Sequence, residues 1–217
     1  MHYEERQLLH KAIQFATEAH QGQKRKGSGL DYICHPLEVL QILTQCDASL
    51  PVLIAGVLHD TIEDTTVTAR QIHDTFGPQV TALVLHHSED KGKTWKERKT
   101  AAIHEAQTGT LDCKLLIAAD KVSNLRSTAA DHKRLGENLW QLFSAGRDEI
   151  RWYYHSMLDA LQELKHHPHS ADLYAEMEQL YHEIFKASPD SHFAFLHFFS
   201  LWMVLISVSC TISRTSA

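Results

Sequence analysis

The stretch Leu58-His59-Asp60-Thr61-Ile62-Glu63-Asp64-Thr65 decides how the rest of the chain is interpreted. It places a histidine and three carboxylates directly after an apolar run, and we expect it to continue a helix. In such a helix His59 precedes Glu63 by four residues. Asp60 precedes Asp64 by the same spacing, so all four side chains project from adjacent stripes at one end. Like charges at this spacing repel one another, and a divalent cation or a proton relieves the repulsion. A neighbouring His-Asp pair suits metals that accept nitrogen and oxygen ligands, so the stretch is a candidate metal site. The alternative interpretation is a solvated acidic helix end that binds no metal.

The composition indicates one globular domain with a sizeable core. The chain has 217 residues, of which 43% are hydrophobic, and a formal net charge of −6. This charge argues against a general nucleic-acid-binding protein, because such proteins usually carry a net basic surface. An anionic ligand would therefore need a local basic patch. Four cysteines without a CxxC pair indicate reduced thiols, and the charged N-terminus lacks the apolar run of a secretory signal, so we expect a cytoplasmic protein.

The spacing of apolar residues predicts an all-α, single-domain fold. Apolar residues recur every three or four positions, as in Leu9, Ala12 and Ala16, and the sustained alternation typical of strands is absent. Gly77-Pro78 fits a helix stop followed by a helix start, and Pro51 fits a first helical turn. The predicted helices span residues 4–20, 36–46, 51–64, 68–76, 78–88, 95–107, 110–127, 135–143, 148–166 and 171–186.

The C-terminal stretch differs from the rest of the chain. Residues 193–212 contain no formally charged side chain, and a helix of this length would span about 30 Å, the thickness of a bilayer's hydrocarbon core. Three interpretations stay open: a membrane anchor, a packing or dimer helix, and a segment foreign to the domain. We divide the chain into a domain at residues 1–187 and an apolar tail at residues 188–217. Membrane contact through the tail is not favoured, and the sequence does not define the oligomeric state.

Two further residues fit a metal site, because a His-Asp pair alone would bind an ion weakly. His35 stands directly before a proline, which favours a helix start and places the imidazole in the first turn. Asp120 ends an apolar run, and a carboxylate that emerges from a buried helix is rarely left unpaired. The alternatives are a packing histidine at position 35 and a salt bridge from Asp120 to Lys121 or Arg126.

These residues occur in the order H…HD…D, and this pattern resembles the HD-domain metal-dependent phosphohydrolases. Several further motifs, over about residues 4 to 130, resemble the hydrolase domain of RelA/SpoT homologues, a subfamily that includes the small alarmone hydrolases. The motifs are Ala19-His20-Gln21-Gly22-Gln23-Lys24-Arg25-Lys26-Gly27, Tyr32-Ile33-Cys34-His35-Pro36, the stretch 58–65, Phe76-Gly77 and Ala119-Asp120-Lys121-Val122-Ser123-Asn124-Leu125-Arg126.

The resemblance implies a hydrolysis that removes the 3′-pyrophosphate from guanosine tetra- or pentaphosphate. Its implied cofactor is Mn²⁺ or another divalent transition metal. The metal ligands that it implies are His35, His59, Asp60 and Asp120. Glu63 and Asp64 match the pair that distinguishes alarmone hydrolases within the HD superfamily. They would orient or deprotonate the attacking water.

The resemblance also implies residues that bind the substrate. Arg25 and Lys26 match a basic pair near the substrate phosphates, and Asn124 matches a nucleotide-contacting position. The run Lys24-Arg25-Lys26 is the kind of local basic cluster that an acidic protein needs in order to receive a polyanion. We therefore expect a small nucleotide as the ligand and no nucleic-acid partner.

Two rival functions stay open. The first is an HD phosphohydrolase that acts on another nucleotide or phosphate ester, such as a nicotinamide dinucleotide phosphate; the pair Glu63-Asp64 favours the alarmone instead. The second is a non-enzymatic sensor that binds a nucleotide and regulates a partner. The complete set of metal and Glu-Asp positions argues against a sensor, because a degenerate site would be expected to have lost at least one of them.

Overall fold

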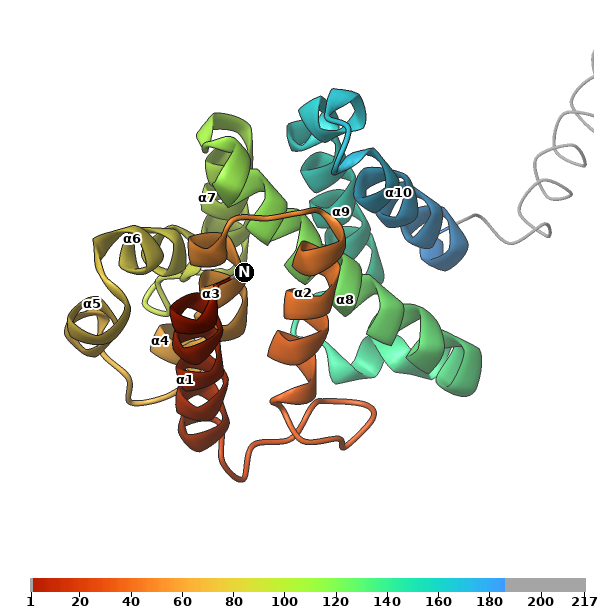
Figure 1. Cartoon of the computed structure of the whole chain (residues 1–217). Helices are drawn as coiled ribbons and strands as arrows, with labels where there is room; N and C mark the ends of the chain where they lie inside the picture. Colours follow the sequence, from red (N-terminus) through yellow and green to blue (C-terminus); the bar gives the residue numbers. More distant parts are fainter. Residues whose placement is uncertain (1, 186–217) are drawn as a thin grey trace, which may run out of the picture. The chain divides into compact units, whose positions relative to one another are not determined.

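The computed structural model describes residues 2–185, and this part of the chain is all-α, as predicted (Figure 1). Its α-helices are α1 (Tyr3–Ala19), α2 (Cys34–Gln45), α3 (Leu50–Leu58), α4 (Thr61–Asp64), α5 (Ala69–Phe76), α6 (Pro78–His87), α7 (Trp95–Thr108), α8 (Leu111–Leu135), α9 (Arg147–Ala160) and α10 (Ala171–Phe185). Two 3₁₀ helices, η1 (Gly136–Leu142) and η2 (Gln162–His166), flank α9. The boundary predicted at residues 187 and 188 and the apolar segment 193–212 lie outside the described residues.

Helix α3 is the central element of the fold. It packs against α1, α2, α6 and α8, and every residue from Val52 to Leu58 is buried. A helix that is apolar on all sides must be enclosed by other elements, which explains its position among these helices in Figure 1. Gly56 allows a close approach of α2, because a Cβ atom at this position would lie 2.5 Å from Cδ1 of Leu43. Helix α3 therefore fixes where the neighbouring helices place their side chains.

The helix predicted over residues 51–64 is broken in the structure, which corrects the sequence-based interpretation. Helix α3 ends before His59, and the His-Asp pair forms a turn ahead of α4. Nδ1 of His59 lies 2.8 Å from the carbonyl oxygen of Gly56, and the Thr61 hydroxyl donates to the carbonyl of Leu58 at 2.7 Å. These side chains bind carbonyls that a continuing helix would pair with backbone N–H groups, so the helix stops here. The pair is presented by a turn and not by two stripes of one helix.

The second half of the chain also differs from the prediction in places. Helix α8 continues beyond the predicted end at residue 127 to Leu135, and its last turn carries three basic side chains that suit the negative end of the helix dipole. Gly136, with φ of 57°, then ends the helix. The predicted helix 135–143 is largely the 3₁₀ helix η1, and the predicted helix 148–166 divides into α9 and η2. The apolar spacing could not show these changes because it does not distinguish a 3₁₀ helix from an α-helix.

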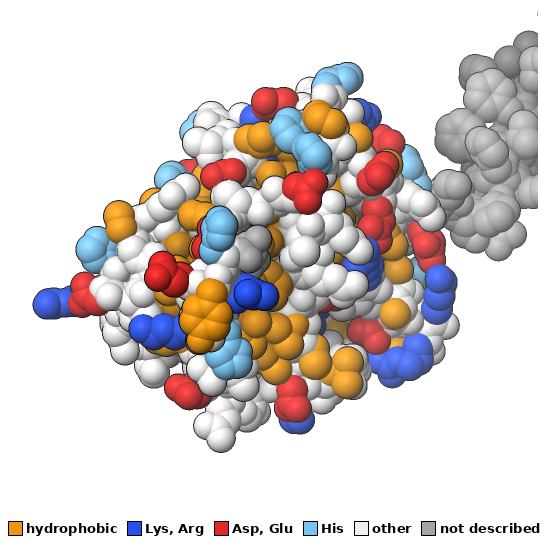
Figure 2. All heavy atoms as spheres, viewed as in Figure 1, with side chains coloured by type: hydrophobic (Ala, Val, Ile, Leu, Met, Phe, Trp, Pro, Cys, Tyr) orange, Lys and Arg blue, Asp and Glu red, His pale blue; other side chains and the backbone are white. Residues whose placement is uncertain are grey.

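The described surface carries mixed charge. Figure 2 shows Lys and Arg side chains interspersed with Asp and Glu on the face in view.

None of the helices within residues 2–185 is both long enough and apolar enough to cross a bilayer. Cys34, Cys46 and Cys113 are free thiols.

We expect Leu43→Ala to lower the free energy of unfolding by about 2–5 kcal/mol, because it leaves a cavity beside Gly56 where α2 meets α3. Leu43 is fully buried, whereas Leu85 on α6 is 48% exposed and provides the matched control. Leu85→Ala should change the free energy of unfolding by no more than about 0.5 kcal/mol. Urea unfolding followed by circular dichroism measures both. Equal effects would show that the contact between α2 and α3 does not stabilise the core.

Candidate metal centre and active site

Four side chains from three parts of the chain meet beside α3. His35 comes from the first turn of α2, His59 and Asp60 from the turn after α3, and Asp120 from the buried part of α8. The residues His35, His59 and Asp120 are buried, and the side chain of Asp60 is 15% exposed. The structure therefore brings together all four residues that the resemblance implies as metal ligands.

The donor atoms of these side chains lie at distances that fit one coordination sphere. The Nε2 atoms of His35 and His59 are 3.2 Å apart. Oδ2 of Asp60 lies 3.0 Å from His59 Nε2 and 3.5 Å from His35 Nε2. Oδ1 of Asp120 lies 3.2 Å from His35 Nε2 and 3.8 Å from His59 Nε2. Bonds of about 2.1 Å to a central ion would place neighbouring donors about 3 Å apart, so the four atoms fit a divalent metal.

The hydrogen bonds behind the two histidines support this assignment. Nδ1 of His59 faces the carbonyl of Gly56 and can only donate to it. The Ser123 hydroxyl donates to Glu38 at 2.8 Å, so its oxygen, 2.8 Å from Nδ1 of His35, accepts a hydrogen from that nitrogen. In their neutral forms both rings therefore carry a lone pair on Nε2. Two lone pairs and two carboxylates facing one another require positive charge between them, which either a proton on an imidazole or a bound metal ion supplies.

The pKa values of the cluster reflect the same requirement. Burial alone would lower the pKa of His59, but the carboxylates of Asp60 and Asp120 outweigh burial and raise it to about 9. Burial lowers the pKa of His35. Burial would raise the pKa of both carboxyl groups, but His59 holds the pKa of Asp60 below its usual range, and Lys121 does the same for Asp120. The cluster thus attracts positive charge where its four donors converge.

Asp120 also forms an ion pair outside the cluster. Nζ of Lys121 lies 2.5 Å from Asp120 Oδ2, so the salt bridge considered from sequence is present together with the histidine contacts. The alternative bridge to Arg126 is absent from the described residues, because Arg126 pairs with Glu38 and Glu176. Asp120 is therefore both a possible ligand and one half of a buried ion pair.

His87, at the end of α6, is a residue that the sequence reasoning missed. Its Nε2 lies 3.2 Å from Asp120 Oδ2, and its ring stands edge-on to that of His59 at 4.9 Å between centroids. Together with donor atoms of His59 and Asp60, its ligand atom belongs to a group within 4.8 Å. Burial lowers its pKa. Nothing in the spacing of the 17 histidines distinguishes it, because its position depends on how α6 packs on α3.

Glu63 and Asp64 line a cavity of about 380 Å³ together with three members of the cluster, His35, Asp60 and Asp120. Glu63 accepts a hydrogen bond from the backbone N–H of Glu89 at 3.1 Å. Lys91 donates to the backbone oxygen of Glu63 at 2.6 Å and to Oδ1 of Asp64 at 2.7 Å, and so fixes the end of α4. Burial raises the pKa of Glu63, which makes its carboxylate a better proton acceptor.

Tyr32 connects the two groups of carboxylates. Its hydroxyl donates to Oδ2 of Asp60 at 2.7 Å and lies 3.4 Å from Oδ2 of Asp64. Burial and the charge of Asp60 raise the pKa of Tyr32, so the hydroxyl stays a neutral donor. The sequence contains Tyr32 inside a motif but does not reveal this contact.

The residues implied in substrate binding also lie together. Nη2 of Arg25 donates to Oδ1 of Asn124 at 3.2 Å and to the Ser127 hydroxyl at 3.0 Å, and Nδ2 of Asn124 donates to Asp120 at 2.6 Å. Lys26 and Asn124 line both the cluster's cavity and a neighbouring cavity of about 400 Å³, which Arg25 also lines. The predicted basic pair therefore lies next to the candidate metal centre.

A family model described as HD domain matches residues 12–151. The chain belongs to the HD-domain family. This HD-domain protein is 41% identical over 124 residues to the guanosine-3′,5′-bis(diphosphate) 3′-pyrophosphohydrolase MESH1 of Homo sapiens, a match that covers 55% of this chain and 68% of the relative.

Two solved structures share this HD-domain fold. The crystal structure of lmo0812 from Listeria monocytogenes EGD-e is 36% identical, with a TM-score of 0.65, and the match covers 70% of this chain and 99% of that one. A metazoan orthologue of SpoT, described as hydrolysing ppGpp, is 26% identical with a TM-score of 0.68, and the match covers 83% of this chain and 97% of that one.

We expect Ser123→Ala to weaken metal binding about 10- to 100-fold, because it removes the acceptor that fixes the tautomer of His35. Ser127 lies one turn further along α8 and contacts Arg25 instead, so Ser127→Ala is the matched control and should keep its metal affinity. Competition of each protein with a chelator for Mn²⁺ measures both affinities. Equal affinities in the two variants would mean that the Ser123 hydroxyl does not position the ligand.

Proposed function

We propose that this HD-domain protein is a metal-dependent hydrolase that removes the 3′-pyrophosphate from guanosine 3′,5′-bis(diphosphate). The observation that carries the proposal is that two imidazole nitrogens and two carboxylates converge, and that His35, Asp60 and Asp120 line the same cavity as Glu63 and Asp64. A relative named for this reaction and a structural relative described as hydrolysing ppGpp support the choice of substrate.

In this proposal, the side chains of His35, His59, Asp60 and Asp120 hold the ion. A set of two nitrogens and two carboxylate oxygens supports Mn²⁺ or a similar transition metal over Ca²⁺, which prefers oxygen ligands alone. When bound, the ion would neutralise phosphate charge and lower the pKa of a nearby water molecule. His87 would support the arrangement through the second oxygen of Asp120.

Glu63 and Asp64 orient the attacking water, and one of them takes its proton. The oxygen of the water forms a bond to the phosphorus that is attached to the ribose 3′-oxygen, and the bond between that phosphorus and the 3′-oxygen breaks. The 3′-oxygen receives a proton, and the products are GDP and pyrophosphate. The raised pKa of Glu63 supports it as the proton acceptor, while Tyr32 and Lys91 hold Asp64 in place.

The nucleoside side of the substrate binds where Arg25, Lys26 and Asn124 meet. The neighbouring cavity combines these polar groups with the aromatic rings of Tyr32 and Tyr154, which suits a nucleotide better than a free phosphate. Arg25 also stands over the ring of Tyr32, with 5.9 Å between the guanidinium carbon and the ring centroid. The formal charge of the whole chain is negative, so these local cations attract the polyanion.

The proposal is tested with the purified full chain, supplied with Mn²⁺ and a panel of nucleotides and resolved by chromatography. We expect GDP and pyrophosphate from guanosine 3′,5′-bis(diphosphate), with activity lost in a chelator and restored by the metal. The panel includes GTP, ATP and a nicotinamide dinucleotide phosphate. Faster turnover of any of these would identify a different substrate, and turnover in the presence of chelator would contradict the metal requirement.

We expect Glu63→Gln and Asp64→Asn to lower turnover by about 10²- to 10⁴-fold, as is typical for the loss of general acid-base help. The amides keep the size of the side chains, so the metal content and the melting temperature should stay close to those of the wild type. Asp74→Asn, at an exposed carboxylate on α5, is the control and should keep full activity. If Glu63→Gln and Asp64→Asn both turn over substrate at the wild-type rate, Glu63 and Asp64 are only a solvated helix end.

We expect Arg25→Ala to raise KM more than it lowers kcat, because the guanidinium contributes charge-assisted hydrogen bonds to the substrate and does not touch the metal. The effect should shrink as salt is added. Arg70→Ala is the matched control and should keep the wild-type KM, since Arg70 lies on α5 and its side chain is 90% exposed. A KM that is unchanged by Arg25→Ala at low ionic strength would remove Arg25 from the substrate site.

A further inference from the structure

Three cations line the cluster's cavity on the side of α7 and α8 and have no part in the function proposed so far. They are Arg98, Lys99 and Lys121. Their side chains are 22%, 19% and 12% exposed, respectively, so all three are largely removed from solvent. Burying several like charges together is unfavourable without anions to balance them, so the partners of each cation decide whether it is free to hold a further anion.

One carboxylate holds two of these cations. Glu89 lies 2.8 Å from Nη1 of Arg98 and 2.6 Å from Nζ of Lys99. Burial would raise the pKa of Glu89, but Lys99, Lys121 and Arg98 together outweigh burial and lower this pKa, so the carboxylate is ionised. The remaining cation, Lys121, pairs with Asp120, which would be shared with the metal.

Most of the hydrogen-bond donors of these cations are unused within the described residues. Each ammonium group has three N–H donors and gives one of them to a carboxylate. The guanidinium of Arg98 gives one N–H to Glu89, and its Nε is buried without a hydrogen-bond partner. An anion with several oxygens in this cavity would satisfy these donors at once.

The three cations are close to one another and to the reacting groups. Nζ of Lys99 and Nζ of Lys121 lie 5.0 and 5.7 Å from the centroid of the Tyr153 ring. Lys121 contacts the candidate ligand Asp120, and the backbone of Glu89 contacts Glu63. The cation group therefore connects the candidate ligands with the carboxylate that handles the water.

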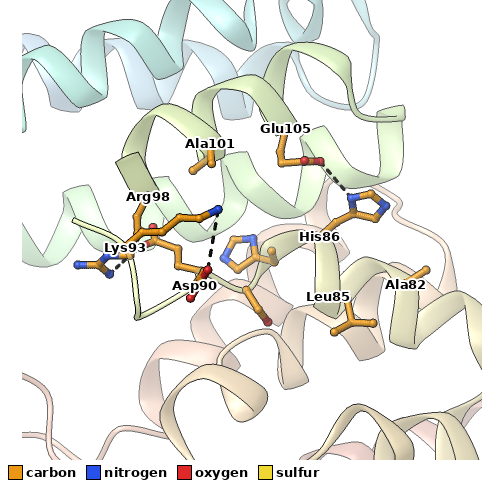
Figure 3. Close-up of a pocket in the computed structure, with 12 residues that line it drawn as sticks. Ala82, Leu85, His86, Asp90, Lys93, Arg98, Ala101 and Glu105 are labelled. Atoms are coloured by element: carbon orange, nitrogen blue, oxygen red, sulfur yellow. Dashed lines mark hydrogen bonds and ion pairs between the residues drawn. The ribbon is translucent and has the colours of Figure 1, made fainter. Parts of the chain in front are cut away.

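A second cavity extends the site in the same direction. It has a volume of about 480 Å³ and shares Arg98, Glu89 and His87 with the cluster's cavity. Figure 3 shows Arg98 and Glu105 on α7 opposite His86 on α6, with Lys93 in the connecting loop. The lining of this second cavity contains no aromatic ring other than histidine, whereas the lining of the cavity around Arg25 includes Tyr32 and Tyr154. A base therefore fits the Arg25 side better, which leaves the Arg98 side for the part of the substrate without a base.

We propose that Arg98, Lys99 and Lys121 form a pyrophosphate-binding subsite on the α7 side of the metal centre. This inference rests on the proposed function and assigns the two products to opposite sides of the cluster. The substrate's 3′-pyrophosphate enters the α7 side, its nucleoside and 5′-diphosphate lie toward Arg25, and hydrolysis between them leaves pyrophosphate on the cations. Glu89 holds Arg98 and Lys99 in place while the subsite is empty.

Titration calorimetry of the metal-loaded full chain with inorganic pyrophosphate tests the subsite. We expect Arg98→Gln and Lys99→Gln each to weaken pyrophosphate binding about tenfold or more, through the loss of charge-assisted hydrogen bonds. Lys99→Arg keeps the charge and should bind as the wild type does. Lys96→Gln is the matched control, because Lys96 lies on the same helix but stands over the Trp152 ring, 2.9 Å from its centroid.

GDP titrated into the same proteins provides the reciprocal measurement. Arg25→Ala should weaken GDP binding and spare pyrophosphate, whereas Arg98→Gln and Lys99→Gln should do the reverse. Lys99→Gln alone leaves Glu89 without one of its cations and could lower the melting temperature. In that case the double variant Glu89→Gln with Lys99→Gln replaces it, because it removes both charges of this ion pair.

Pyrophosphate affinity that is the same in the wild type, Arg98→Gln and Lys99→Gln would overturn the proposal, as would an equal loss in Lys96→Gln. Because pyrophosphate binding is measured without turnover, the proposed subsite and the proposed hydrolysis reaction can fail separately. If the wild type hydrolyses guanosine 3′,5′-bis(diphosphate) but the variants bind pyrophosphate normally, the subsite is wrong and the function stands. If the wild type does not hydrolyse that nucleotide but the variants lose pyrophosphate, the subsite stands and the substrate is wrong.

Discussion

Two imidazole nitrogens and two carboxylates point at one another beside the central helix, and the rest of the structure depends on this arrangement of four acceptors. Such a group is unfavourable unless positive charge lies at its centre. The fold keeps it in place through hydrogen bonds to the far side of each ring: the carbonyl of Gly56 fixes one ring, and Ser123 fixes the other with the help of Glu38. The cluster therefore dictates where α3 ends and how α2 and α8 approach it.

The remaining groups in the cavity follow from the position of this cluster. Because α4 starts directly after the turn, its two carboxylates lie next to the place where the ion would bind, at a position suited to a water molecule. Tyr32 and Lys91 then hold Asp64 from two sides. Cations lie in two separate places, around Arg25 and around Arg98, which is how an acidic protein can bind a substrate with a phosphate group at each end.

The sequence predicted the all-α class and the family, because apolar spacing and the motif order are local properties of the chain. It also predicted which four residues would come together, since their order matches that of a known family. It could not predict the break after Leu58, where two side chains compete with the backbone for the same carbonyls. It could not find His87 either, because the contact of His87 with Asp120 depends on how α6 and α8, which are far apart in the sequence, pack on each other.

The central claim is that one divalent ion is held between the two imidazoles and the two carboxylates. Anomalous diffraction at the manganese absorption edge, from crystals of active protein grown with Mn²⁺, measures its position most directly. The account predicts one strong peak about 2.1 Å from Nε2 of His35 and His59, with Asp60 and Asp120 completing the set. A peak elsewhere in the chain, or no peak in crystals whose protein is active on redissolving, would contradict it.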